Sequence, residues 1–403
     1  MKGHFYKPHC KCTTKKCKCS ATWSYMIDVG INPDTGKRKQ KKKGGFATKA
    51  EAEVHAAQLL IELKQGTYME EQNVTFKSFV QDIWIPMYEK SGIKKSTMRA
   101  REFDIQRLSK HLQHYKMKDI TLKIYQKCID ELSKELAPNS LSNTNATGKM
   151  IFRKAISMGV IKKNPTEFVQ FPKRAETVED LESTEEVVKY LEKEQLNEFL
   201  SLAQTHGLER DYPIFFTLAY TGMRVGELCS LKWKDIDFDS REISITKTMY
   251  NPNSKTINYE LLTPKTKTSR RKITVVPELL EVLQQHKNIQ NEVKMRYRNI
   301  YYDNDFVFAK HQKTKGYPET IKTINYRMGR LLKIAGLDPS LTPHSLRHTH
   351  TSLLAEAGAS IYEIMDQLGH KNDKTTETVY LHVTKSRKLD ISSKFSTLMK
   401  TIK

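Results

Sequence analysis

The sequence predicts a multidomain α+β protein. We expect a small basic three-stranded sheet with one helix, a helical domain, and a mainly helical domain with a small antiparallel sheet. The chain has 403 residues, which is more than one ordinary domain contains. Strand-like segments occur near the N-terminus and again after residue 235, whereas residues 74–171 show only helical periodicity. Residues 172–189 are acidic and poor in aromatic side chains, which is typical of an exposed linker.

The first module covers residues 1–70. Residues 23–30 (WSYMIDVG) predict a strand, and the Pro and Gly within residues 32–36 predict a turn. The basic run at residues 37–43 predicts a second strand, and Phe46 is a candidate for a third.

A helix is expected from Thr48 to about Gly66, because Thr48 and Glu51 have the spacing of a capping box. The module carries 14 Lys and Arg against 6 Asp and Glu. Its basic strand is a candidate for contact with DNA, because a small sheet can lie in a groove. The candidate residues are Lys37, Arg38, Lys39, Lys41, Lys42 and Lys43. The alternative is a solvated edge strand whose charges prevent aggregation.

The helical domain is predicted to span residues 74–171. Apolar residues recur at helical spacing in four segments, which are Thr75–Lys90, Ser96–His111, Leu122–Leu136 and Asn139–Met158. The Asn-Pro pair at residues 164–165 and the Phe-Pro pair at residues 171–172 mark its end, because a residue that precedes proline disfavours helix.

The last domain is predicted to span residues 190–385, with a tail at residues 386–403. It begins with helices and continues with strand patterns, at Leu191–Ala203, Tyr212–Tyr220, Ile236–Phe238, Ile243–Thr248 and Ile273–Val276. The rest is helical. The tail has one apolar stripe, as a short helix would, and such a helix needs a surface to pack against. That surface belongs either to a neighbouring protomer or to its own domain.

The net charge is +22, from 68 Lys and Arg against 46 Asp and Glu. This surplus favours a polyanionic partner, because each neutralised phosphate releases counterions; the alternative is a soluble protein with a lysine-rich surface. The apolar stretch at residues 213–220 is far shorter than the about 20 residues that span a bilayer. The first residues, MKGHFYKPHCKC, lack the apolar core of a signal peptide. We therefore expect a cytoplasmic protein with no membrane partner.

Four cysteines crowd into the first 20 residues as two CxC pairs, which are Cys10, Cys12, Cys17 and Cys19. Four soft ligands this close predict a structural zinc site, and His4 or His9 could replace one cysteine. The alternative is a set of exposed thiols in a reducing compartment. Cys128 and Cys229 fall in apolar helical patterns and are predicted to be core residues.

Five short motifs in the last domain carry the candidate catalytic residues. In the first, residues 221–228 (TGMRVGEL), a glycine turn would place Arg224 at a helix start, with Glu227 on the same face. The second, residues 263–271 (TPKTKTSRR), lies between two strand patterns and therefore predicts a hairpin that carries a lysine.

The third motif, TPHSLRH, predicts the start of a helix, with Thr342 as N-cap and Pro343 at the first helical position. His344 and Arg347 are three residues apart and would share one face of that helix.

The fourth motif is Leu-Gly-His, which ends at His370, and the fifth is TVYLH, which contains Tyr380 ten residues later. A second tyrosine, Tyr362, falls in an apolar helical pattern and is predicted to be a core residue.

This ordered set of motifs resembles the tyrosine recombinase family, also called phage integrases. The resemblance covers residues 190–385 by motif and the whole chain by layout. The layout is most similar to integrases of temperate phages and of conjugative transposons of Gram-positive bacteria. Those carry an arm-type DNA-binding domain, a helical core-binding domain and a catalytic domain. One departure is the spacing from His370 to Tyr380, which in the family is often nine residues.

The resemblance implies a site-specific DNA recombinase of a mobile element. Its partners would be double-stranded DNA with core and arm sites, and further copies of itself in a tetramer on DNA. A directionality factor and a host DNA-bending protein are further candidates. Two alternatives compete: a type IB topoisomerase, which shares the tyrosine chemistry, and a DNA-binding regulator without catalysis.

The chemistry explains these residue types. Breaking a phosphodiester requires positive charge at the phosphate oxygens, and the guanidiniums of Arg224 and Arg347 would supply paired planar donors. By resemblance, Lys265 is the acid that protonates the leaving 5′ oxygen, with Lys267 as the alternative because the Lys-Thr repeat blurs the register. Tyr380 would attack phosphorus and form a 3′-phosphotyrosine.

Supporting roles complete the predicted site. His344 and His370 would hydrogen-bond the phosphate, and His344 could accept the tyrosine proton. Glu227 is predicted to orient the arginine or to cap its helix. Because the phosphotyrosine keeps the energy of the phosphodiester, we expect no ATP and no catalytic metal, and the sequence has no Walker lysine motif.

Overall fold

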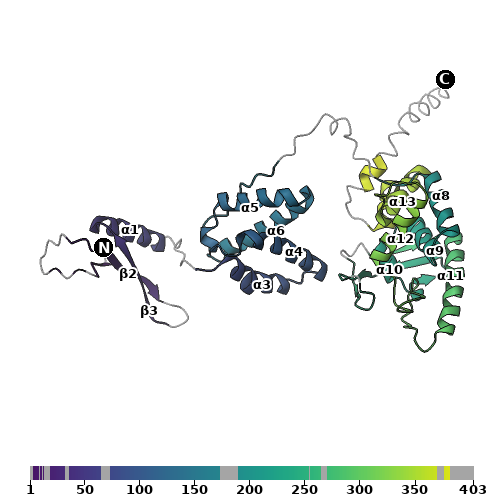
Figure 1. The fold of residues 1–403 in the computed structure, drawn as a ribbon, viewed down its shortest axis with the longest axis horizontal. Helices are drawn as coiled ribbons and strands as arrows, with labels where there is room; N and C mark the ends of the chain where they lie inside the picture. The colour runs from purple at the N-terminus through teal and green to yellow at the C-terminus, as the bar shows by residue number, and fades with distance from the viewer. Residues whose placement is uncertain are drawn as a thin grey trace, which may run out of the picture. The chain divides into compact units, whose positions relative to one another are not determined.

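The computed structural model describes residues 3–8, 10, 12, 19–31, 36–64, 73–172, 189–253, 255–264, 270–369 and 376–381. The chain divides into two units, residues 1–175 and residues 176–403. The first unit contains a sheet with one helix and a separate helical bundle, and the second is mainly helical with small antiparallel sheets (Figure 1). The predicted fold class is therefore confirmed. The predicted linker and tail lie almost entirely outside the described residues.

The N-terminal sheet has the order β1-β2-β3, with antiparallel neighbours. Its strands are β1 (Gly3–Tyr6), β2 (Trp23–Ile31) and β3 (Arg38–Phe46), and helix α1 (Lys49–Lys64) packs on it. Alternate β2 residues Tyr25 and Ile27 point to the helix and bury against Ala52 and Ala56, as the two-residue period of a strand requires.

The capping box is present, because Glu51 N donates to Thr48 Oγ1 (3.2 Å) and Thr48 N donates to Glu51 Oε2 (3.4 Å). The assignment of Phe46 was wrong: it ends β3, and the third strand is β1. Four residues are too few to show a strand period, so only the pairing of β1 with β2 reveals it.

The helical bundle occupies residues 73–172. Its elements are α2 (Phe76–Ser78), the π-helical η1 (Phe79–Trp84), α3 (Ile85–Lys90), α4 (Lys95–Leu112), the 3-10 turn η2 (Met117–Asp119), α5 (Leu122–Glu135) and α6 (Pro138–Ser157). The predicted single helix over residues 75–90 is interrupted by the π turn. Pro86 explains this, because it has no N–H to donate to Asp82.

Close packing of α5 against α6 depends on Gly148. A Cβ at this position would lie 2.0 Å from the Tyr125 hydroxyl oxygen. Tyr125 is fully buried and donates to Asn145 Oδ1 (3.2 Å). Cys128 lies in the same core, as predicted.

Helix α9 (Asp211–Thr221) lies at the centre of several helices of the second unit. The others are α8 (Lys193–Thr205), α10 (Val225–Ser230), α11 (Pro277–Arg296), α12 (Ile321–Ile334), α13 (Pro343–Ala357) and α14 (Ile361–Leu368), and residues 376–381 are also helical. Helix α9 contacts α8, α10, α11 and α13. Its residues are apolar on almost every side, which is typical of a fully enclosed helix. Cys229 of α10 is buried, as predicted.

The strands of this unit form two separate sheets. One has the order β4-β5-β8, from β4 (Ile236–Asp237), β5 (Glu242–Ile245) and β8 (Arg271–Thr274); the other pairs β6 (Thr248–Tyr250) with β7 (Glu260–Leu262). The predicted strand at residues 243–248 is therefore split between them. The two predicted strands that flank the lysine motif, at residues 243–248 and 273–276, do pair antiparallel as β5 with β8, whereas residues 265–269 lie outside the described residues.

Tyr362 was predicted to be a core residue, but its side chain is 80% exposed. Ile364 and Leu368, one helical turn apart, form the buried face of α14, and Tyr362 lies off that face. Within the described ranges, no helix has the length and apolar character needed to cross a membrane.

Candidate active site

The turn between α9 and α10 carries Arg224. Helix α9 ends at Gly222, whose φ of 58° is left-handed. Arg224 is the N-cap of α10 in an extended conformation, and both its backbone N (3.0 Å) and its Nη1 (3.1 Å) donate to the carboxylate of Glu227. Glu227 thus contacts both the cap and the guanidinium, and the Arg224 side chain remains 38% exposed.

Glu227 has a second cationic neighbour, Arg271, at the start of β8. Arg271 Nη2 donates to Glu227 Oε2 (3.0 Å), and Arg271 Nε donates to the backbone oxygen of Gln367 (2.7 Å). Burial alone would raise the pKa of the Glu227 carboxyl. The charge and hydrogen bonds of Arg271, together with those of Arg224, instead hold this pKa below its ordinary value.

Arg347 joins two helix ends. Helix α13 begins as predicted, with Pro343 in its first turn and Thr342 N donating to Ser345 Oγ (3.2 Å). One turn later, Arg347 Nη1 donates to the oxygen of Gly222 (2.6 Å) and Nη2 to that of Leu368 (2.7 Å).

Both acceptors of Arg347 are carbonyls at helix C-termini, α9 and α14, where the helix dipole attracts a cation. Each helix is closed by a left-handed glycine, Gly222 or Gly369 (φ 69°). The Arg347 side chain is therefore held among the Arg224 turn, the end of α14 and its own helix, and the residue is only 2% exposed.

His350 is a neighbour of this cluster that the sequence analysis missed. Its Nδ1 lies 2.8 Å from the oxygen of Ala219, and its Nε2 lies 3.2 Å from Gln367 Nε2. Burial lowers the pKa of His350 to about 4, so the ring is neutral near pH 7 and Nδ1–H donates to Ala219. Its spacing of three residues from Arg347 was the signal that could have found it.

The other predicted site residues that the structure describes differ in their burial. His344 is exposed at the start of α13, and its ring meets that of His348 edge-on at 4.7 Å. Tyr380 is half-buried against a small cluster that contains Ala355, Ile364 and Leu368. Tyr380 therefore packs on the α13–α14 pair that also holds Arg347.

Lys265, Lys267 and His370 lie outside the described residues. Their neighbours are described: Arg271 follows the lysine segment, and Leu368 precedes His370 by two residues. Arg271 contacts the residue before Leu368, which places the flanks of both motifs beside Glu227.

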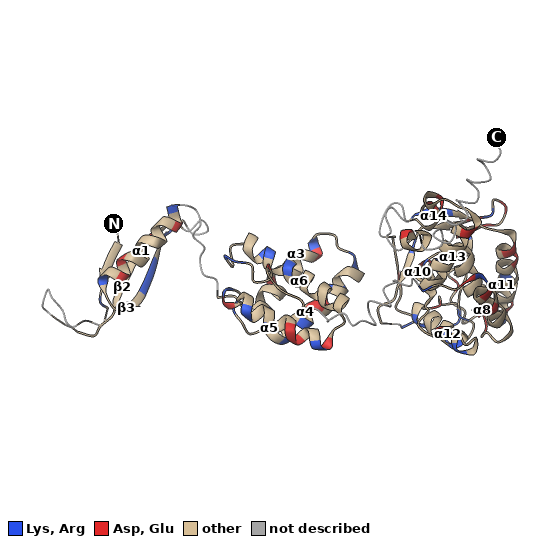
Figure 2. Cartoon of the chain, turned by 90° about the horizontal axis from the view of Figure 1, so that it is seen from above, with Lys and Arg blue, Asp and Glu red and all other residues tan. Residues whose placement is uncertain are grey.

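The basic strand of the N-terminal module is an open edge, because β3 is the last strand of its sheet. Figure 2 shows Lys and Arg along this strand. Arg38 pairs with Asp28, and Lys43 Nζ lies 2.9 Å from His55 Nε2. Lys42 is exposed. The strand therefore presents positive charge at the edge of its sheet. Both alternatives, contact with DNA and a solvated edge strand, predict this arrangement.

The N-terminal cysteines lie together. The Sγ atoms of Cys10, Cys12 and Cys19 are all within 4.8 Å of one another, and the distance from Cys10 Sγ to Cys19 Sγ is 3.6 Å. This is too long for a disulfide, which needs about 2.05 Å. Cys17 and His9 lie outside the described residues, and His4 stacks on Tyr6 in β1.

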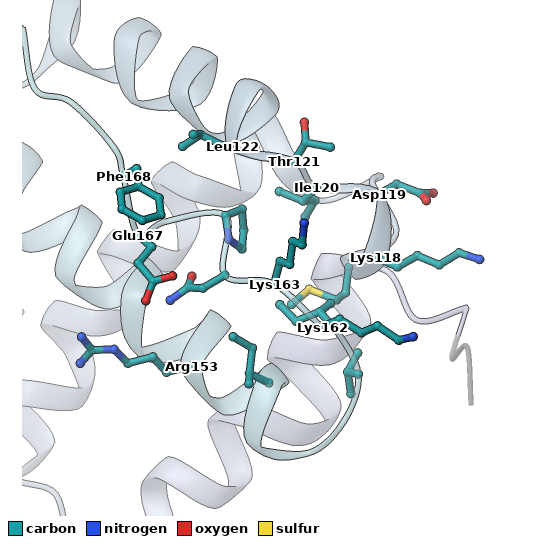
Figure 3. Close-up of a pocket in the computed structure, with 16 residues that line it drawn as sticks. Lys118, Asp119, Ile120, Thr121, Leu122, Arg153, Lys162, Lys163, Glu167 and Phe168 are labelled. Carbon is teal, nitrogen blue, oxygen red and sulfur yellow. The ribbon is translucent and has the colours of Figure 1, made fainter. Parts of the chain in front are cut away.

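A groove of about 950 Å³ opens in the helical bundle. Its lining combines apolar residues such as Ile120 and Val160 with the basic side chains of Lys118, Lys162 and Lys163. Figure 3 shows Lys118 and Lys162 extending to the same side. The basic rim suits contact with anionic groups.

Comparison with known proteins covers most of the chain. Residues 189–387 match the model of the phage integrase family, residues 13–63 match an arm DNA-binding domain, and residues 75–133 match the N-terminal SAM-like domain of phage integrases. The integrase of Staphylococcus phage L54a is 29% identical over 84% of this chain and 97% of its own length. The ICEBs1 integrase of Bacillus subtilis strain 168 is 28% identical over 93% of this chain and 97% of its own.

Solved structures show the same fold. The Tn1549 transposon integrase in complex with transposon right end DNA superposes with a TM-score of 0.63 and 24% identity, covering 80% of this chain and 100% of that one. A lambda integrase dimer bound to a core site gives a TM-score of 0.56 at 21% identity, with 89% and 92% covered. The family matches and the curated relatives show that the chain belongs to the phage integrase family and is a site-specific recombinase of the tyrosine type.

Proposed function

We propose that this protein integrates and excises a mobile element by cutting and rejoining DNA strands through a 3′-phosphotyrosyl intermediate at Tyr380. The observation that carries the proposal is the placement of Arg347. Hydrogen bonds from its Nη1 and Nη2 tie the turn of Arg224 to the end of α14, on the helix pair against which Tyr380 packs.

In the proposed cleavage step, the Tyr380 hydroxyl oxygen attacks phosphorus, and its proton passes to His344. The bond from phosphorus to the 5′ oxygen breaks, and that oxygen takes a proton from Lys265, or from Lys267 as the alternative. Arg224 and Arg347 stabilise the charge on the non-bridging oxygens, with His370 as a further donor.

Rejoining reverses this step with a 5′ hydroxyl of another strand. The number and kind of bonds are the same before and after, so we propose that the reaction uses neither ATP nor a catalytic metal. Glu227 supports Arg224 without touching DNA, because its carboxylate is buried and already accepts from two arginines.

The domain roles follow the family layout. We assign residues 1–70 to arm-site binding through the basic strand β3, residues 74–171 to core-site binding, residues 172–189 to a linker, and residues 190–385 to catalysis. The tail at residues 386–403 would dock on a neighbouring protomer.

The proposed assembly is a tetramer on DNA. Lambda integrase has been solved as a tetramer bound to a Holliday junction, and its fold likeness to this chain supports the same arrangement here. A directionality factor and a host DNA-bending protein remain proposed partners. Because the substrate is chromosomal and element DNA, we place the activity at the bacterial nucleoid in the cytoplasm.

We further propose a structural zinc at Cys10, Cys12 and Cys19, with Cys17 as fourth ligand. A tetrahedral zinc–sulfur site with bonds of about 2.3 Å places its sulfur atoms about 3.8 Å apart, close to the 3.6 Å between Cys10 and Cys19. The residues between β1 and β2 form a long connection that such a site would close, which lowers its entropy in the unfolded chain.

The test of the main proposal is covalent trapping on a suicide DNA substrate with a nick near the crossover site, in EDTA and without ATP. The wild-type chain should form a protein–DNA adduct, and Tyr380→Phe should bind the same DNA without forming one. A requirement for a divalent metal would refute the mechanism, since arginines and a lysine are proposed to supply that charge.

A further inference from the structure

Arg271 is the residue of the active-site region to which the predicted chemistry gave no role. It is the first residue of β8, directly after the segment that carries Lys265 and Lys267. Its side chain is 5% exposed and reaches two different elements. Nη2 donates to Glu227 of α10 (3.0 Å), and Nε donates to the backbone oxygen of Gln367 in α14 (2.7 Å).

Each of these contacts ends beside an arginine that is proposed to bind the phosphate. Glu227 also accepts from Arg224, through Nη1 at 3.1 Å and the backbone N at 3.0 Å. Gln367 is followed by Leu368, whose oxygen accepts from Arg347 (2.7 Å). Arg271 thus contacts a residue that supports Arg224 and the neighbour of a residue that supports Arg347, and its backbone pairs with Ile245 of β5.

We propose that Arg271 is a positioning residue for the reaction: it holds Glu227 so that Arg224 keeps its positive charge available to the phosphate, and it holds the end of α14 beside Glu227. This inference rests on the proposed phosphate-binding role of Arg224 and Arg347. In this proposal Arg271 acts through Glu227 and the end of α14 and not by contact with DNA.

The net charge of three neighbouring side chains explains how Arg271 affects Arg224. With Arg271 present, the carboxylate of Glu227 is shared by two guanidiniums, and the trio of Arg224, Glu227 and Arg271 keeps a net charge of +1. Without Arg271, the same carboxylate would face Arg224 alone, and their pair would be neutral. A buried carboxylate would then draw Arg224 toward itself and away from the phosphate.

The variants for the test are Arg271→Met and Arg271→Lys in the full-length chain, with Lys272→Met as the matched control. Lys272 is the next residue of the same strand; it is 67% exposed and pairs at the surface with Glu242 (2.8 Å). Single-turnover cleavage of the nicked substrate is measured at saturating protein, and DNA affinity is measured separately.

Arg271→Met should cleave roughly 100-fold more slowly, the size of loss that follows when one charge-stabilising donor is disturbed, with an affinity within about threefold of wild type. Arg271→Lys should recover part of the cleavage rate, because lysine restores the positive charge but not the simultaneous contact with Glu227 and Gln367. Lys272→Met should cleave like wild type.

The pH profile separates positioning from a purely structural tie. The charged groups that face Glu227 are Arg224 from α10 and Arg271 from β8, and they keep its pKa low against the effect of burial. In Arg271→Met the pKa of Glu227 should rise, so lowering the pH should neutralise its carboxylate, release Arg224 and bring the cleavage rate closer to that of wild type. In a Glu227→Gln background, Arg271→Met should cost much less than it does alone.

Wild-type cleavage by Arg271→Met would overturn the inference. So would a slow variant with a lowered melting temperature, an unchanged pH profile and additive loss with Glu227→Gln, because that combination describes a structural tie. Failure of the wild-type chain to trap DNA would instead refute the proposed function, so the two failures are distinguishable.

Discussion

Replacing Gly222 by Ala tests the geometry around Arg347. Gly222 has a φ of +58°, and a Cβ at this position would lie 2.7 Å from His350 Cδ2 and 2.8 Å from Leu368 Cδ2. Neither neighbour can yield easily. His350 is held through both ring nitrogens, and Leu368 is fully buried in the turn whose carbonyl binds Arg347.

The expected cost has two parts. A side chain in the left-handed region costs about 1–2 kcal/mol, and overpacking of a tight core adds about 1–3 kcal/mol, giving about 2–5 kcal/mol in total. Gly336 is a matched control because its φ is +64° and no atom lies within 4 Å of its added Cβ. Gly336→Ala should therefore cost only the first part.

The assay is thermal unfolding of the full-length variants, followed by single-turnover cleavage. One kcal/mol corresponds to about 2–4 °C for a unit of this size, so Gly222→Ala should lower the melting temperature by roughly 4–20 °C and Gly336→Ala by roughly 2–8 °C. Because the Gly222 oxygen accepts from Arg347, only Gly222→Ala should also slow cleavage. Equal melting temperatures and equal rates for the two variants would refute the packing described here.

Three other predictions concern separate parts of the chain. The pKa of His350 is lowered to about 4, so the unfolded chain binds a proton that the folded chain does not; stability should be full above about pH 6.5 and fall by up to about 3 kcal/mol toward pH 4. A melting temperature that is flat over this range, or unchanged in its slope by His350→Gln, would contradict the burial of a neutral ring. Metal analysis should find about one zinc per chain, lost when Cys10 and Cys19 are both Ser; metal-free wild-type protein would rule the site out. Replacing Lys41 and Lys42 by Gln should weaken arm-site binding and lower its salt slope by about 2, whereas core-site cleavage should not change; an unchanged slope would favour the solvated edge strand.

Much of the candidate site was visible in the sequence because it depends on local spacing. Arg224 and Glu227 are three residues apart, and so are His344 and Arg347, so a single helical turn relates each pair. The Thr48–Glu51 capping box and the Thr342-Pro343 helix start also need only neighbouring residues. The order of the motifs then sufficed to indicate the family.

Other features depend on contacts between distant segments. Arg347 binds the oxygen of Gly222, 125 residues away, and Arg271 binds Glu227, 44 residues away. Nothing in the spacing of the motifs shows that these groups meet, because the meeting point is set by how α9, α13 and α14 pack. For the same reason, the sequence showed Arg271 only as one of two adjacent arginines.

The sequence by itself determined which residues form helices, where several of them begin, and which side chains can perform phosphoryl chemistry, since propensity, capping and apolar period act over a few residues. Tertiary structure alone decided strand partners and burial. It assigned β1 to the N-terminal sheet, separated β7 from β8, and left Tyr362 exposed. Pairing and burial depend on which surfaces exclude water together, and those surfaces come from segments far apart in the chain.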